Sequence, residues 1–200
     1  MLASEIIARY EAYCPQELSM EGDISGLQIG TLDKEVDKVL VALDIREQTV
    51  AEAIEAGAGL IIVKHAPIFR PLKDLVADKA QNQMILDLIK HDIAVYVSHT
   101  NIDVVEDGLN DWFCQLLDIE ETSFLSQTSP DYGIGRVGRI APQTFGDFAA
   151  KVKETFGLDS LRLITYDETD LERVIERVAI CGGSGQSFYP EAISKGAQVY

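Results

Sequence analysis

The chain has 200 residues, of which 46% are hydrophobic and 25% are charged, and its formal net charge is −16 at pH 7. This length allows a substantial core, and the composition is typical of a globular protein. Binding to nucleic-acid phosphates or to an anionic membrane needs clustered Lys and Arg, so the acidic balance argues against broad electrostatic binding to either.

The cysteines and the amino terminus indicate the compartment. Cys14, Cys114 and Cys181 are far apart and form no C-x-x-C pair, so the sequence supports neither a disulfide framework nor a cysteine zinc cluster. The first 14 residues have the pattern of an amphipathic helix, and no apolar run approaches the roughly 18 residues of a membrane span. We therefore expect a reduced, cytoplasmic protein.

Helices and strands are predicted to alternate through the first part of the chain. Apolar residues at helical spacing predict helices at 2–13, 48–56, 79–91 and 107–117. Short apolar runs bounded by turn residues predict strands at 25–30, 36–43, 60–63 and 93–97. This order is typical of βαβ units with a parallel sheet. Trp112 lies at helical spacing in the last of these helices, where we expect it in the core.

The polar stretch "SQTSPDYG", residues 126–133, is the predicted linker between two lobes. After it we expect a strand at 134–140, a helix at 145–156, and strands at 161–166 and 177–181. The predicted domains are 1–125, with the candidate site, and 126–200.

The two parts of the sequence match at a constant offset of 139 residues. "VDKVLV" (36–41) corresponds to "IERVAI" (175–180), and "EAIEAGAGLI" (52–61) to "EAISKGAQVY" (191–200). Strand–helix–strand units resemble one another in general, but the ungapped register favours a true duplication. We therefore predict two related α/β lobes with mostly parallel strands and flanking helices. Tyr200 corresponds to Ile61 inside a strand, so we expect the second lobe to be truncated at its C-terminal end.

The stretch "LIIVKHAPIF" ends a predicted buried strand on Lys64 and His65. The carboxyl ends of parallel strands lie at one edge of a sheet, so "SHTNID" after the next strand should bring His99 and Asp103 to the same edge. Imidazole and carboxylate are suitable ligands for Zn, Mn, Fe or Co. The alternatives are a packed histidine at 65 and a turn carboxylate at 103. The third histidine, His91, is predicted to cap a helix.

A second glycine-rich stretch, "CGGSGQS" at 181–187, could form an anion-binding nest after a strand. Such turns are also common for packing reasons alone. We predict Cys181 to be a core residue rather than a nucleophile.

The ordered motifs "GLQIG", "VALD", "KHAPIF", "HTNID" and "CGGSG" extend over almost the whole chain. Together they resemble the Nif-three-like dinuclear-metal-centre family, whose members are commonly named homologues of GTP cyclohydrolase I type 2. The resemblance implies a two-lobed α/β protein that assembles into a hexameric toroid. It also implies two divalent metals in each subunit.

Residue by residue, the resemblance assigns His65 and Asp103 as metal ligands, and His99 as a residue that orients a ligand. The family pattern His-His-Pro is Lys64, His65, Ala66 and Pro67 in this sequence. The family's Trp-Asp-Asn before Gly-Leu-Gln is replaced by "EGDIS", and its ligands near the carboxyl terminus have no counterpart before Tyr200.

Lys64 stands where the family has a ligand. A lysine ammonium has no free lone pair, so Lys64 could replace the charge of one metal and leave a single-metal site. Alternatively, its pKa is lowered by a neighbouring cation and the neutral amine binds metal. One or two metals per chain are therefore expected.

The predicted function is metal-dependent hydrolysis, or a cyclohydrolase reaction, on a nucleotide-like small molecule. Arg70 and Lys73, with Lys64, are candidate contacts for substrate phosphate. The alternative is a non-enzymatic ring that binds metal or serves as a partner-binding scaffold. The sequence singles out no catalytic residue, and nucleic-acid binding is the least favoured function.

Overall fold

The computed structural model describes residues 1–200, which divide into two compact units, Met1–Ile102 and Asp103–Tyr200. The boundary precedes the linker expected at 126–133, because that stretch lies inside a hairpin of the second unit. Its backbone closes the hairpin through a bond from Thr128 N to Tyr132 O. No helix is both long and apolar enough to cross a membrane.

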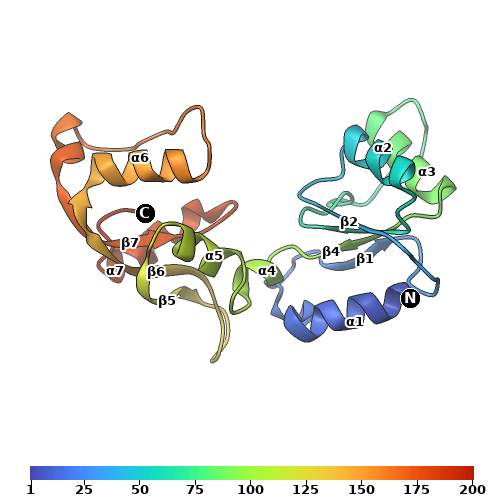
Figure 1. Cartoon of the computed structure of the whole chain (residues 1–200), viewed down its shortest axis with the longest axis horizontal. Coiled ribbons are helices and arrows are strands. Elements are labelled where there is room, and N and C mark those ends of the chain that lie inside the picture. Colours follow the sequence, from blue (N-terminus) through green and yellow to red (C-terminus); the bar gives the residue numbers. More distant parts are fainter. The chain divides into compact units, whose positions relative to one another are not determined.

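The first unit is a four-stranded sheet with helices on both faces (Figure 1). The strand order is β1-β4-β3-β2; β4, β3 and β2 are parallel, and β1 is antiparallel to β4. The elements of this unit are α1 (Ala3–Tyr13), a short 3₁₀ turn (Gln16–Leu18), β1 (Gly26–Ile29), β2 (Val39–Ala42), α2 (Glu47–Ala56), β3 (Leu60–Val63), α3 (Ala80–Lys90), β4 (Ala94–Val97) and the start of α4 (Asn101–Val104).

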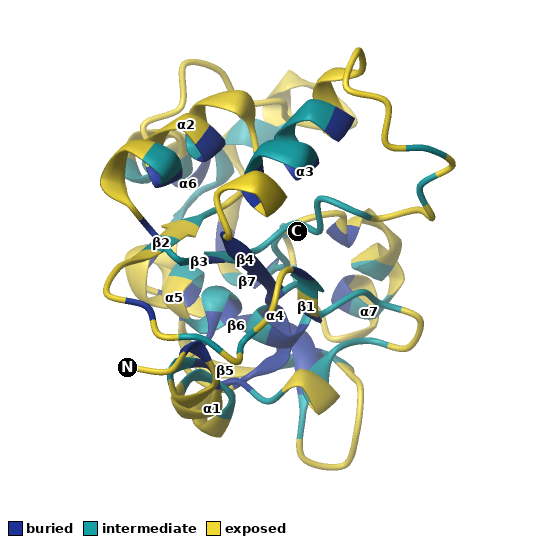
Figure 2. Ribbon diagram, turned by 90° about the vertical axis from the view of Figure 1, so that its right-hand side faces the viewer, coloured by how far each residue is buried: buried dark blue, intermediate teal, exposed yellow.

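The core of this unit lies on the two faces of the sheet. Ile61, Val63, Val95 and Val97 pack in the cluster with residues of α2 and α3, whereas Tyr96 packs in the cluster with residues of α1. Every residue of β4 is buried (Figure 2). A parallel strand covered on both faces needs such a continuous apolar run, which explains why "AVYV" lacks the alternation of a half-exposed strand.

The second unit is built on an antiparallel sheet of order β5-β6-β7. Its elements are α5 (Leu109–Leu116), β5 (Glu120–Gln127), β6 (Gly133–Thr144), α6 (Phe145–Thr155), a 3₁₀ turn (Glu168–Glu172), β7 (Val174–Ile180), a 3₁₀ turn (Gly185–Phe188) and α7 (Tyr189–Ser194). The α/β class is therefore confirmed, but mostly parallel strands occur only in the first unit.

The duplication is visible in backbone geometry. Val39 pairs with Leu60 in parallel, and at the offset of 139 Val178 forms a parallel bridge with Val199. Two backbone hydrogen bonds of the first unit also recur in the second unit at this offset. The bond from Gly59 N to Lys38 O (3.1 Å) recurs from Gln198 N to Arg177 O (2.8 Å). The bond from Ala58 N to Ala53 O recurs from Ala197 N to Ala192 O, both at 2.9 Å. Helix α7 and the bridge at Val199 therefore correspond to α2 and the start of β3.

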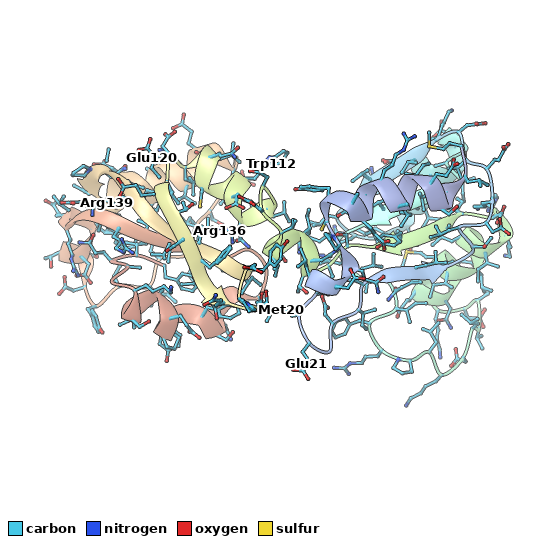
Figure 3. All side chains as sticks on the ribbon, turned by 90° about the horizontal axis from the view of Figure 1, so that it is seen from below. Met20, Glu21, Trp112, Glu120, Arg136 and Arg139 are labelled. Atoms are coloured by element: carbon cyan, nitrogen blue, oxygen red, sulfur yellow. The ribbon has the colours of Figure 1, made fainter.

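Three local predictions for the second unit were wrong. Trp112 is 61% exposed on α5 rather than buried (Figure 3), because Asn110 and Cys114 provide the buried face of that helix. Residues 161–166 form no strand, and Ile164 is 89% exposed. Strand β5 was not predicted, because its apolar residues are confined to its second half.

Candidate metal centre

His65 lies just beyond β3 and is held by Asp44. The pairing of β2 and β3 continues past both strands, with His65 N donating to Leu43 O at 3.0 Å. This register places His65 Nδ1 2.7 Å from Asp44 Oδ1, while Arg46 donates to Asp44 Oδ2 at 2.8 Å. The hydrogen bond with His65 lowers the pKa of the Asp44 carboxyl, and the bond from Arg46 acts in the same direction. The Nε2 atom of His65 is left for a ligand.

His99, just beyond β4, is held in the same way by Asp23. The distance from His99 Nδ1 to Asp23 Oδ1 is 2.5 Å, and Thr100 donates both its backbone N–H and its hydroxyl to Asp23 Oδ2. The Asp23 side chain is 7% exposed. Burial alone would raise its pKa, but the hydrogen bonds from Thr100 and His99 outweigh it and lower the pKa. Asp23 is therefore a carboxylate that fixes the orientation of His99.

The two imidazoles meet at the edge of the first sheet where β3 and β4 end. Their ring centroids are 5.8 Å apart, and the planes are inclined at 76°. A carboxylate on Nδ1 fixes the tautomer and presents Nε2, which is the usual arrangement of a metal-binding histidine. The predicted convergence of His65 and His99 is thus found. His99 has the same type of carboxylate partner as His65, which makes it as suitable a ligand as His65.

Lys64 belongs to this edge as well. Its Nζ atom donates to the backbone carbonyl of His99 at 3.2 Å, linking the end of β3 to the end of β4. The amino group therefore lies next to the histidine pair, as both hypotheses for Lys64 require.

Arg70 and Lys73 lie farther along, in the exposed loop between β3 and α3. Gln28, on β1, holds the start of this loop: Ile68 N donates to its Oε1, and its Nε2 donates to Ile68 O, both at 3.1 Å. Neither basic side chain makes a hydrogen bond to His65 or His99. The loop position leaves both basic groups accessible to solvent.

Asp103, the other predicted ligand, is the first residue of the second unit and is 4% exposed. Asn110 holds its backbone, because Asn110 Nδ2 donates to Asp103 O at 2.8 Å. The Oδ1 of the same amide accepts the N–H of Gly182 at 3.0 Å. Asn110 therefore links the "CGGSG" stretch to the backbone of Asp103. Cys181 is partly buried and packs against the cluster that contains Leu125 and Val137.

The donor set in this chain is suitable for a metal but incomplete. No group of three or more His, Cys, Asp or Glu side chains is arranged to hold an ion. Two oriented imidazoles match the chemistry of Zn, Mn, Fe or Co, whereas a closed protein site needs further donors. His91 is separate from the pair: it is exposed at the end of α3, where its Nδ1 contacts Asp87 O at 2.9 Å.

Sequence reasoning missed four residues that position the site: Asp23, Asp44, Gln28 and Asn110. The sequence contained a pattern that could have identified two of them, Asp44 and Gln28. Asp44 follows a predicted strand directly at the same sheet edge as His65, and Gln28 lies in "GLQIG". Asp23 is 76 residues from His99, and Asn110 is 72 residues from Gly182, so no local pattern could have linked them.

The chain matches known proteins over its whole length. The model of the Duf34/NIF3 (NGG1p interacting factor 3) family matches residues 1–200. A protein of Streptococcus pneumoniae named GTP cyclohydrolase 1 type 2 homolog is 70% identical over 200 residues, which are 100% of this chain and 76% of that protein. A Lactococcus lactis protein of the same name is 52% identical with the same coverage.

Solved structures agree with this match. A Bacillus cereus protein related to NIF3 superposes with a TM-score of 0.94 at 28% identity, covering 100% of this chain and 81% of that one. Reduced HcgD from Methanocaldococcus jannaschii gives a TM-score of 0.81 at 29% identity, with coverages of 98% and 75%. The resemblance seen in the sequence motifs is confirmed, and the chain belongs to the Duf34/NIF3 family.

Proposed function

We propose that this chain binds a divalent metal at the edge formed by His65 and His99, and that the metal serves a hydrolytic or cyclohydrolase reaction. The observation that supports this most directly is the pair of imidazoles, each with a carboxylate on Nδ1. A metal held there would supply Lewis acidity and a water acidified towards a pKa of about 7. The proposed ligands in the first unit are His65 and His99, and Asp103 stays a ligand predicted from the resemblance alone.

The residues around the pair have separate roles in this proposal. Asp44 and Asp23 hold the two rings with Nε2 presented, so that no rotation is needed when a ligand binds. Lys64 contributes a positive charge beside His99, which favours a single metal and an anionic substrate group. Arg70 and Lys73, on the loop held by Gln28, offer donors for a phosphate.

A nucleotide-like substrate follows from the names of the relatives, since the Streptococcus pneumoniae and Lactococcus lactis proteins are both called GTP cyclohydrolase 1 type 2 homologs. Ring opening of GTP is therefore the first reaction to test. A cytoplasmic location and a homohexamer are further parts of the proposal. The three cysteines are free thiols, which a reducing compartment would preserve.

A second candidate is a ring that binds metal without turnover, or that serves as a scaffold for partners. The observation that favours it is the incomplete donor set, because a site with few protein ligands can hold an ion without providing a base or an acid. A family name does not establish a reaction.

The first experiment is elemental analysis of protein purified without chelator or affinity tag. We expect one or two metals per chain in the wild type and a loss of at least half of the metal in His65→Ala. His91→Ala is the matched control, because His91 lies outside the pair, and its metal content should not change. Equal metal content in His65→Ala and the wild type would exclude the site.

A turnover screen then separates the two candidates. GTP, other nucleotides and simple phosphoesters are incubated with metal-loaded wild-type protein and with the His65→Ala variant. Turnover that requires His65 supports the enzyme, and binding of metal without any turnover supports the scaffold. In Lys64→His, a second bound metal would show that Lys64 replaces the charge of one metal.

A further inference from the structure

The loop between β3 and α3 is held at two adjacent residues just before Phe69. The side chain of Gln28, on β1, bonds to both the N–H and the C=O of Ile68. Gln81, near the start of α3, donates from its Nε2 to the backbone carbonyl of Pro67 at 2.8 Å. Side chains from a strand and from a helix therefore fix the backbone that leads into Phe69.

The far end of the same loop is held by Asp74. Its Oδ2 accepts from Lys79 Nζ at 2.5 Å, and its Oδ1 accepts from Asn82 Nδ2 at 2.8 Å. The backbone N–H of Val76 also donates to Asp74 Oδ1, at 3.3 Å. These hydrogen bonds, the one from Lys79 above all, lower the pKa of the Asp74 carboxyl. Asp74 is therefore a carboxylate that is already neutralised by Lys79.

The residues between the two held ends, 69–73, present one aromatic and two basic side chains. Phe69 is 60% exposed, although the backbone before it is fixed. Arg70 and Lys73 are exposed, and neither makes a hydrogen bond or an ion pair with the rest of the chain. In a chain with a formal net charge of −16, two neighbouring cations without an acidic partner are available to bind an anion.

These side chains line a cavity of about 460 Å³, to which Asn82 also contributes. Pockets for small molecules are typically about 300–1,000 Å³. Asn82 is 4% exposed, and its Nδ2 donates to Asp74 Oδ1 and, at 3.0 Å, to Val76 O. Because both partners are acceptors, the orientation of this amide is fixed. Its Oδ1 accepts no hydrogen bond from the protein and is left for a donor on a ligand.

The cavity is complementary to a planar ring that carries phosphate. The exposed face of Phe69 can stack on such a ring. Arg70 and Lys73 can form charge-assisted hydrogen bonds with phosphate oxygens. The Oδ1 of Asn82 can accept a hydrogen bond from a ring N–H or from a sugar hydroxyl. A nucleoside phosphate has all of these groups, whereas a simple phosphoester has no ring to stack.

We propose that this cavity binds a nucleotide, with Phe69 stacked on the base and with Arg70 and Lys73 on the phosphates. The choice of a nucleotide over other phosphorylated rings rests on the proposed function. Phe69 is the residue that determines specificity, because the two cations alone would bind any phosphate compound. The backbone bonds from Gln28 and Gln81 hold Phe69 in place before the ligand binds, so little ordering of the loop is needed.

The test is a calorimetric titration with GDP, guanosine and inorganic pyrophosphate in the His65→Ala background. This background lacks a proposed metal ligand, and the wild type in EDTA should give the same affinities. We expect GDP to bind more tightly than either fragment. Adding Phe69→Ala should weaken GDP at least about tenfold, the size expected for loss of base stacking, and leave pyrophosphate unchanged. Phe69→Trp should retain the affinity for GDP.

The cations and the matched controls complete the test. Arg70→Gln should weaken GDP and pyrophosphate alike. Val76→Ala is the apolar control, because Val76 is 51% exposed in the same loop but does not line the cavity. Arg9→Gln is the charge control, because Arg9 is an exposed cation on α1 without an ion pair. Both controls should bind GDP like the background.

Three results would overturn the proposal. They are a failure of GDP to bind the background and the wild type in EDTA, equal GDP affinity with and without Phe69→Ala, or equal losses for GDP and pyrophosphate in Phe69→Ala. The last result would mean that the substitution distorts the loop instead of removing a stacking surface. A wild type without metal or turnover would contradict the proposed function, but it would leave these titrations unchanged.

Discussion

The two units share one strand–helix–strand segment but use it in different surroundings. In the first unit the segment joins a parallel sheet, and all three histidines of the chain lie in that unit. In the second unit the same segment follows β6, whose Arg136 is 3% exposed and whose neighbours satisfy every guanidinium nitrogen. The comparison teaches that the repeated sequence determines the local turn and register, whereas the neighbouring strand determines the chemistry at the edge.

The largest expected loss of stability is confined to the second unit and comes from a change at Arg136. Arg136 Nε and Nη2 donate to the two Asp111 oxygens at 2.5 and 2.6 Å, and Arg136 lies 4.9 Å from the centre of the Phe124 ring. Arg136→Met leaves Asp111 without this partner, and breaking a buried pair in this way costs about 3–5 kcal/mol. Hydrogen exchange measured in each unit should show the loss in the second unit only.

The matched control removes both charges. Because the double variant Arg136→Met with Asp111→Leu leaves no unpaired charge, it should recover most of the lost stability. A similar loss in the double variant would mean that Arg136 acts through packing on Phe124 rather than through its charge.

A second prediction concerns acid stability in the first unit. The folded state lowers the pKa of Asp23, so its contribution to stability is complete above the unfolded value of about 4 and is lost as pH falls through the folded value. Asp23→Asn should cost about 2 kcal/mol at pH 7, in the range of hydrogen bonds to a charged group. Its stability should also fall less steeply than that of the wild type below pH 4.

The measurement is urea unfolding of both proteins at pH 7 and at several values below 4, with a probe in the first unit. Asp33→Asn is a suitable control, because Asp33 is exposed and makes no side-chain hydrogen bond to His99 or Thr100. Parallel stability curves for Asp23→Asn and the wild type would contradict the assignment of Asp23 to His99.

Sequence alone predicted the features that depend on local pattern and register. The offset of 139, the strands at 36–43 and 60–63, and the convergence of His65 with His99 all follow from periodicity and from the rule for parallel strands. The features that it missed depend on tertiary partners. Residues 161–166 alternate in polarity like a strand but have no strand beside them, and Glu121 in β5 has a positive φ of 49° within an irregular pairing.

The third prediction tests the duplication with a matched pair of substitutions. Gly57 and Gly196 end equivalent helices with φ of 67° and 73°, and a Cβ at either position has no atom closer than 3.9 Å. Gly57→Ala and Gly196→Ala should therefore cost only the strain of a left-handed residue, about 1–2 kcal/mol each. Thermal unfolding of the two variants should give equal losses, and a difference greater than about 1 kcal/mol would show that the two turns are not equivalent.

The smallest expected effect on stability concerns the two basic side chains that cap the equivalent helices of the two units. Lys38 Nζ donates to Ala56 O at 2.7 Å, and Arg177 Nε donates to Lys195 O at 2.8 Å, so each basic residue caps the helix of its own unit at equivalent positions. Lys38→Met and Arg177→Met should each lower the free energy of unfolding by about 0.5 kcal/mol. The loss is small because both hydrogen bonds are exposed, and each substitution removes a cation near a helix C-terminus.

Hydrogen exchange of the Gly57 and Gly196 amides can detect so small a change. A loss of 0.5 kcal/mol corresponds to exchange about twofold faster at the affected turn, with the other turn as the internal reference. Faster exchange at one turn only would mean that the two caps differ in strength, although they are alike in geometry. A structural reason is present at Arg177, whose backbone N–H also donates to the side-chain Oε1 of Gln198 at 2.9 Å.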